Sequence, residues 1–165
     1  MNVYVVDTNV PVVANGRSEQ ADQDCVIACI DALADIRDAG MIVLDGLMLI
    51  LDEYMRNLSM SGQPGPGDLF MKWVWNNQAN RDRCEQVPIT ARADDSDSFV
   101  EFPDDPELAD FDRSDRKFVA VARASIHSPV ILNAVDSDWA QFHGALVRHG
   151  LTVRFLCPQH CAPAH

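Results

Sequence analysis

The sequence has no hydrophobic run long enough to cross a membrane as a helix, and its first residues lack the basic and apolar regions of a signal peptide. We therefore expect a soluble, cytoplasmic protein. Positive charge is also scarce, because 13 Lys and Arg residues stand against 25 Asp and Glu residues, which gives a formal net charge of −12 at pH 7. This balance argues against a broad basic face for nucleic acid, although it leaves room for a local basic rim.

Cysteine is too sparse and too irregularly spaced for a disulfide framework, since the chain has five, an odd number. We expect reduced thiols, with Cys25 and Cys29 as small buried residues of a helix. Cys157 and Cys161 flank His160 in a tail that ends at His165, an arrangement that could be drawn as a zinc site. It lacks a second paired motif of convincing spacing, so the sequence does not favour zinc there.

Apolar residues make up 47% of the 165 residues, enough for one compact domain with a sizeable core. Short apolar runs alternate with helical periodicity, which predicts a three-layer α/β/α domain with a central, mainly parallel sheet. The predicted strands lie at residues 3–6, 41–44, 129–133 and 152–156, and residues 84–90 and 99–102 are read either as short strands or as extended loop. The predicted helices lie at about 22–39, 47–59, 68–77, from 112 onward and at about 139–149.

The predicted domain spans residues 1–157 and carries an acidic insertion at about 62–111, followed by a loosely held tail at 158–165. Pro11 and the Asn15-Gly16 pair predict a loop after the first strand. The insertion includes Trp73 and a second tryptophan two residues on. It could cover a site, select a substrate, or hold a partner or a second subunit.

The first strand ends abruptly on an acid. Residues 3–6 are four β-favouring residues without alternation, which is typical of a strand buried on both faces in a parallel sheet. Ligands of open α/β sheets bind beyond the carboxyl ends of the strands, where Asp7 and Asn9 would emerge. The alternative is that both are ordinary turn formers that leave a strand.

Three further acids have informative positions. Asp136 follows the strand at 129–133, and Asp115 shares a helix face with apolar residues, although an acid in a first helical turn also suits the helix dipole. Asp52 and Glu53 both lie away from the apolar face of their helix, so periodicity does not choose between them.

If Asp7, Glu53, Asp115 and Asp136 converge, each pair about 5 Å apart would repel by roughly 3 kcal/mol at an effective dielectric of about 20. Such an arrangement is costly for stability unless something relieves the charge. Divalent cations would do so, and Mg²⁺ or Mn²⁺ is the natural match for carboxylate oxygens.

These residues resemble the PIN domain, a nuclease fold found in bacterial toxins and in RNA-processing enzymes. The resemblance covers nearly the whole chain and depends on four short motifs in order: Val5-Val6-Asp7-Thr8-Asn9, Leu51-Asp52-Glu53-Tyr54, Ser114-Asp115-Arg116-Lys117-Phe118-Val119-Ala120-Val121-Ala122 and Val135-Asp136-Ser137-Asp138-Trp139. It implies that four residues are the catalytic, metal-binding acids, namely Asp7, Glu53, Asp115 and Asp136. Asn9 would help to orient this site, and Asp112 and Asp138 could stand near the metals.

The resemblance implies a metal-dependent endoribonuclease that hydrolyses RNA with Mg²⁺ or Mn²⁺, as in the toxin of a toxin–antitoxin pair. The resemblance also implies an antitoxin protein as a binding partner and a second copy of this chain in a homodimer. Arg113, Arg116 and Lys117 could bind RNA phosphates, although solvated surface charge explains such residues equally simply.

Other functions remain open at this point. A haloacid-dehalogenase-like phosphatase also begins with a strand ending in Asp, but it needs a second Asp where Asn9 stands. A non-catalytic PIN-like module would use the acidic pocket only to bind a metal or a partner. Another metal-dependent phosphohydrolase would use the same acids on a different phosphate ester.

Overall fold

Five strands form one sheet in the computed structural model, which describes residues 1–161. The order across the sheet is β3-β2-β1-β4-β5, and every neighbouring pair is parallel. The strands are β1 (Val3–Val6), β2 (Met41–Asp45), β3 (Cys84–Val87), β4 (Val130–Asn133) and β5 (Thr152–Phe155). The predicted α/β fold with a parallel sheet is confirmed.

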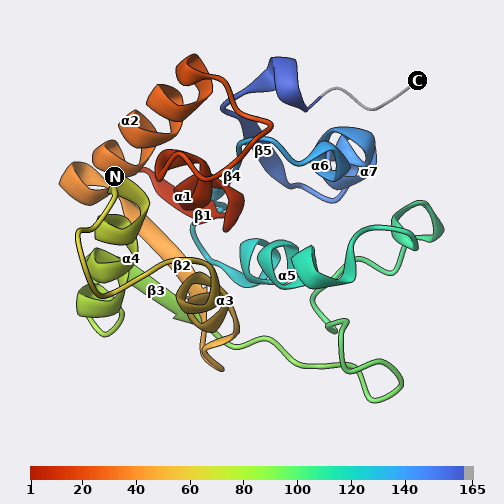
Figure 1. Cartoon of the computed structure of the whole chain (residues 1–165). Helices are drawn as coiled ribbons and strands as arrows, with labels where there is room; N and C mark the ends of the chain where they lie inside the picture. Colours follow the sequence, from red (N-terminus) through yellow and green to blue (C-terminus); the bar gives the residue numbers. More distant parts are fainter. Residues whose placement is uncertain (162–165) are drawn as a thin grey trace.

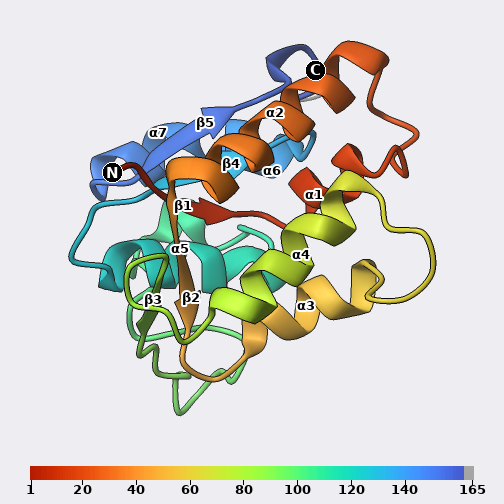
Figure 2. The same ribbon diagram turned by 90° about the vertical axis from the view of Figure 1, so that its left-hand side faces the viewer.

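Helices cover both faces of this sheet. They are α1 (Asn9–Ala14), α2 (Gln23–Ala39), α3 (Leu49–Asn57), α4 (Pro66–Asn77), α5 (Arg116–Ala124), α6 (Ser137–Gln141) and α7 (His143–Arg148). Helices α2 and α4 lie on one side, and α5, α6 and α7 on the other (Figures 1 and 2). Helix α1 packs against α2 and α4, and α3 packs against α4, which completes the three layers. Within residues 1–161, no helix is long and apolar enough to cross a membrane.

The strand order reverses between β1 and β4. From β1 the chain moves outward through β2 to β3, and it then returns to the other side of β1 for β4 and β5. Open α/β sheets bind ligands at such a reversal, in the crevice beyond the carboxyl ends of the two strands. Asp7 follows β1 directly, and Asp136 lies three residues after the end of β4. Two of the predicted site residues therefore belong to this crevice.

The core explains why β1 reads as an unbroken apolar run. Val5 and Val6 are almost fully buried, as are Ile131 and Leu132 of the neighbouring β4, because helices pack on both faces of these strands. Helix α5 contacts β1, β2 and β4, and all of its residues from 116 to 122 are buried. This burial fixes the position of the residue just before α5, which is Asp115.

The segment after β1 is a helix where the sequence predicts a loop. Pro11 is compatible with α1 because it occupies the first turn, where backbone N–H groups have no partner within the helix. The turn signal at Asn15 and Gly16 does hold, since Gly16 has a positive φ of 72° and the helix ends there.

The acidic insertion is narrower than the predicted 62–111. Helix α4 packs against α1 and α2 in the outer layer, and β3 is the edge strand of the sheet, so both belong to the fold itself. Only residues 88–112 lie outside it, as the long green loops of Figure 1 show, and we call them the acidic segment. Three buried aromatic side chains anchor this segment to the core, namely Phe99, Phe102 and Phe111.

The expectation of five reduced thiols is wrong for two of them, because Cys25 and Cys157 form a disulfide. Their separation of 132 residues hides the pairing from any local pattern. The chain beyond β5 is also better held than predicted as far as Cys161, which is buried after a short helical turn at Pro158–His160. Residues 162–165, His165 included, lie outside the described residues.

Candidate metal centre

Asp7 is placed by the end of the central strand. Its backbone N–H donates to the Leu132 carbonyl at 3.1 Å, which continues the pairing of β1 with β4. Its carboxylate is 4% exposed and accepts two hydrogen bonds, from the Asn9 backbone N–H at 2.9 Å and from Trp139 Nε1 at 2.8 Å. Two donors thus hold the carboxylate in one orientation while the remaining lone pairs stay available.

Asp115 and Asp136 come from two different elements on the side of the sheet covered by α5 and α6. Asp115 ends a 3₁₀ turn at Arg113–Asp115 and directly precedes α5, where it is 7% exposed. Asp136 caps α6, since its Oδ1 accepts from the Asp138 backbone N–H at 2.9 Å. The second oxygen of Asp136 is left to face the other acids.

The three aspartates converge. One carboxylate oxygen from each of Asp7, Asp115 and Asp136 lies within 4.8 Å of the others. Burial raises the pKa of Asp7 to about 7. The hydrogen bonds from Asn9 and Trp139 oppose this shift, and the charges of Asp136 and Glu53 add to it. Burial and then the charge of Asp7 raise the pKa of Asp115 to about 10, and a protonated Asp115 can donate to Asp136. We call these three residues the aspartate triad.

Two asparagines tie the carboxyl ends of β1 and β4 together beneath the triad. Asn9 Nδ2 donates to Asn133 Oδ1 at 2.7 Å, and Asn9 Oδ1 accepts from the Ala134 backbone N–H at 2.8 Å. Asn133 is fully buried and donates to the Asp136 carbonyl at 2.9 Å. The predicted orienting role of Asn9 thus has a geometric basis. Sequence reasoning missed Asn133, whose signal is a polar residue that ends an apolar strand.

Glu53 lies beside the triad but is already paired. Lys117 Nζ donates to Glu53 Oε1 at 2.8 Å, and the Thr8 hydroxyl donates to Glu53 Oε2. Glu53 still raises the pKa of Asp7 by its charge, so the two carboxylates are close. Helix α3 presents Glu53 rather than Asp52 to this site, which decides the choice that periodicity left open. The partners Thr8 and Lys117 lie 45 and 64 residues away in the sequence.

The two second-choice acids flank the triad. Asp112 caps the 3₁₀ turn before α5 and accepts from both the backbone N–H and the hydroxyl of Ser114. Burial, and then the charges of Asp136 and Asp112, raise the pKa of Asp138. Both carboxylates therefore add negative charge at the edge of the site without joining the three converging oxygens.

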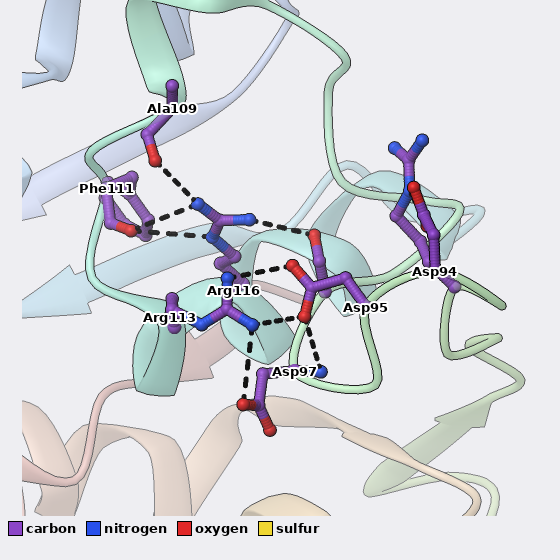
Figure 3. Close-up of polar contacts among 9 residues, drawn as sticks. Asp94, Asp95, Asp97, Ala109, Phe111, Arg113 and Arg116 are labelled. Atoms are coloured by element: carbon purple, nitrogen blue, oxygen red, sulfur yellow. Dashed lines mark hydrogen bonds and ion pairs between the residues drawn. The ribbon is translucent and has the colours of Figure 1, made fainter.

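The arginines predicted to bind phosphate are engaged by the acidic segment instead (Figure 3). Arg113 forms a two-pronged ion pair with Asp95 and a longer one with Asp97. Arg116 is buried, and it donates to the Ala109 carbonyl at 2.9 Å and to Ser98 Oγ at 3.0 Å. Arg116 thus holds the acidic segment in place and does not face solvent.

A hollow of about 460 Å³ opens beside Lys117, between α3, the acidic segment and the turn before α5. Leu49 and Phe99 give it an apolar wall, and charges of both signs line the rest, namely Arg56, Arg113, Lys117, Asp52 and Asp97. Arg113 and Lys117 are paired with acids. Arg56 forms no ion pair within residues 1–161. Sequence reasoning passed over Arg56 because a basic residue in the last turn of a helix reads as a solvated cap.

The donor set of the triad fits a hard divalent cation. Carboxylate oxygens are the ligands that Mg²⁺ and Mn²⁺ take, and metal–oxygen bonds of about 2.1 Å set neighbouring oxygens about 3 Å apart. The three oxygens lie within 4.8 Å of one another, so they would have to move closer together to share one ion. No lysine or arginine pairs with any of the three carboxylates within residues 1–161, so the charge of the triad is uncompensated by the chain itself.

No protein-family model, no curated protein and no solved structure matches this chain. The function must therefore be inferred from the chemistry of the triad and its surroundings.

Proposed function

We propose that this chain is a metal-dependent endoribonuclease of the PIN-domain kind, which hydrolyses RNA phosphodiester bonds with Mg²⁺ or Mn²⁺ at the aspartate triad. The observation that supports it most is the convergence of Asp7, Asp115 and Asp136 at the strand-order reversal. Asp7 and Asp115 are buried, Asp136 is half-buried, and no lysine or arginine of residues 1–161 pairs with any of them. The four acids expected from the PIN resemblance are Asp7, Glu53, Asp115 and Asp136, and all four lie in this crevice.

A purely structural role explains the triad poorly. Ionised carboxylates about 4.8 Å apart repel each other by about 3 kcal/mol at an effective dielectric of about 20, and the burial of Asp7 and Asp115 adds to the cost. Asp7 and Asp136 accept hydrogen bonds, but no lysine or arginine of residues 1–161 pairs with them. Asp45 is a structural carboxylate by contrast: it accepts from the backbone N–H groups of Leu47, Leu49 and Ile50, and it belongs to no converging group of acids within the described residues. A site for a cation accounts for the arrangement of the triad.

The residues of the site have distinct tasks in this proposal. Asp7, Asp115 and Asp136 would hold the cation, and Trp139 and the Asn9–Asn133 pair would keep the ligands in place. A bound Mg²⁺ or Mn²⁺ would activate water and neutralise charge on the scissile phosphate. The Lys117 ammonium, held against Glu53, would add positive charge next to the phosphate.

RNA is the proposed substrate because the hollow at Ser114 and Lys117, the residues on either side of Asp115 and Arg116, combines cations with an apolar wall. Arg56 and Lys117 suit the sugar–phosphate backbone, and Leu49 and Phe99 suit the face of a base. The positive charge is local, which reconciles an RNA substrate with a net charge of −12. A toxin role, an antitoxin partner and a homodimer remain predictions of the PIN resemblance.

The proposal is tested by incubating labelled single-stranded RNA of mixed sequence with the purified chain and Mn²⁺, with chelator, and with an Asp115→Asn variant. Internal cuts that need Mn²⁺ and Asp115 are the expected result. A phosphomonoester substrate runs in parallel. Release of phosphate without RNA cleavage would mean that the chain is a phosphatase and not a nuclease. If neither substrate is consumed, the acids would belong to a metal-binding module without this activity.

A further inference from the structure

Four of the five cysteines lie near one another in the fold, at the start of α2 and in the chain after β5, and none of them belongs to the motifs that carry the aspartate triad. Cys25 and Cys29 lie on consecutive turns at the start of α2, and Cys157 and Cys161 bracket the short helical turn after β5. All four are buried. We call them the cysteine cluster. The fifth, Cys84, lies on the edge strand β3.

Both halves of this cluster have the same spacing, Cys-x₃-Cys, which falls within the range typical of paired zinc ligands. The sequence shows only one candidate pair near His160, and it is the fold that sets a second pair opposite the first. Sulfur atoms of Cys25, Cys29 and Cys157 lie within 4.8 Å of one another. Four zinc–sulfur bonds of about 2.3 Å in a tetrahedron set the sulfurs about 3.8 Å apart. Cys25 and Cys157 are joined by a disulfide in this structure, so their sulfurs would have to separate after reduction to reach that spacing.

Cys161 is the fourth candidate ligand, although its sulfur lies outside the group that converges within 4.8 Å and would have to move toward it. Its thiol lies against the Cys157 backbone, donating to that carbonyl at 3.4 Å and to the Ala134 carbonyl at 3.0 Å. Asn133 Nδ2 donates to the Cys161 sulfur at 3.5 Å, an N–H···S contact of the kind that supports a metal-bound thiolate. His160 is the other candidate, since its Nε2 is buried and makes no hydrogen bond within residues 1–161, but this nitrogen lies 3.3 Å from the Asp22 carboxylate and does not belong to the converging group of sulfurs.

We propose that the reduced cysteine cluster is a structural zinc site, with Cys25, Cys29, Cys157 and Cys161 as its four ligands. The disulfide between Cys25 and Cys157 is the oxidised alternative to the same site. A dithiol reductant supplies two electrons and two protons to that disulfide and becomes a disulfide itself. Zn²⁺ then binds as the four thiols release their protons.

Burial fits this assignment better than it fits a reactive thiol. All four cysteines are shielded from solvent, and a closed, buried set of sulfurs is what structural zinc requires. The site would fasten α2 to the chain beyond β5, as the disulfide does.

The test starts from the full chain expressed with zinc and purified under a dithiol reductant. About one zinc per chain should be retained, and exchange with Co²⁺ should produce the near-ultraviolet absorbance of cobalt–thiolate bonds. The aspartate triad has oxygen ligands only, so it contributes nothing to this absorbance. Two results would overturn the proposal. One is a wild-type chain with a reduced Cys25–Cys157 pair that shows no such absorbance, and the other is a chain whose Cys25–Cys157 disulfide survives the reductant.

Matched variants separate the metal site from the disulfide. Cys29→Ser removes one ligand while leaving both disulfide cysteines, so the cobalt–thiolate absorbance should be lost or shifted to a weaker three-sulfur form. Cys84→Ser is the control, because Cys84 is equally buried but lies on β3, and it should keep the full absorbance. Unchanged absorbance in folded Cys29→Ser would remove Cys29 from the site and refute the four-cysteine assignment.

Discussion

Asp7 and Asp115 look alike in burial but differ in what their oxygens contact. Both oxygens of Asp7 accept from donors, Asn9 and Trp139, so an asparagine would turn its amide N–H toward one of them. A buried donor left unpaired costs about 1–3 kcal/mol. Asp115 faces carboxylates, and an asparagine there can donate to Asp136. Asp115→Asn is therefore the cleaner probe of the triad.

The metal-free chain should lose stability as the pH rises from about 5 to 8. Asp7 and Asp115 both have pKa values raised above the ordinary 3.8, so the folded chain holds protons that the unfolded chain has released. Each such proton lowers the free energy of unfolding by up to about 1.4 kcal/mol per pH unit until the pH passes the raised pKa. Urea unfolding in chelator, at one-unit pH intervals, measures this slope.

Asp115→Asn is the control for that slope. The variant lacks the raised Asp115 pKa, so it should lose less stability than wild type over the same range and be the more stable of the two at pH 8. Acids with lowered pKa values, such as Asp22 and Asp68, act only below their ordinary pKa and do not contribute in this window. Parallel slopes for variant and wild type would show that Asp115 titrates normally.

At the scale of elements, the turn before α5 joins the acidic segment to the site. Arg116 is buried, donates to backbone carbonyls and lies 4.8 Å from the Phe102 ring centre, whereas the Arg113 side chain is 52% exposed. We expect Arg116→Gln to cost about 2 kcal/mol or more, because it leaves buried carbonyls without donors. Arg113→Gln should cost at most about 1 kcal/mol, as exposed ion pairs do.

Urea denaturation of the two variants, with wild type beside them, measures that difference. The two residues lie three positions apart on the same turn, so each serves as the matched control for the other. A larger loss for Arg113→Gln than for Arg116→Gln would mean that the surface ion pairs, and not the buried guanidinium, hold the acidic segment.

Local patterns predicted most elements correctly, and the misses have physical causes. Apolar runs located the strands, and helical spacing located α2 and α4. The helix predicted at 47–59 begins later, at Leu49, because the residue before it, Met48, has a left-handed backbone with φ 68°. Asp45 then accepts from the backbone N–H groups of Leu49 and Ile50 in the first turn of α3. Capping by a residue of the preceding strand leaves no signal in hydrophobic periodicity.

Side-chain pairings across the fold were beyond the sequence. It identified Asp7, Asp115 and Asp136 because each follows a strand or interrupts an apolar helix face. It could not foresee that Lys117 pairs with Glu53, or that the two Cys-x₃-Cys pairs meet, since these partners are 64 and 132 residues apart. Such contacts depend on the strand order, and local periodicity carries no information about which strands become neighbours.

For the whole molecule, the strand-order reversal determines where chemistry can occur. Asp7 and Asp136 reach one crevice because β1 and β4 are adjacent and parallel, and α5 brings Asp115 over the same edge. The excess of negative charge, −12 overall, makes a divalent cation there favourable. Cations are available to an anionic ligand in the hollow next to Ser114, where Arg56 has no ion pair within residues 1–161. Fold and charge thus point to the same small region.

Mn²⁺ binding by the metal-free chain is the measurement that bears most directly on the aspartate triad. Electron paramagnetic resonance of free Mn²⁺ during a titration at pH 7.5 counts the bound ions for wild type and for Asp115→Asn. Wild type should bind Mn²⁺ at the triad, and the variant should bind it at least about tenfold more weakly while remaining folded. Equal affinity in the two proteins would mean that the converging carboxylates are not the metal site.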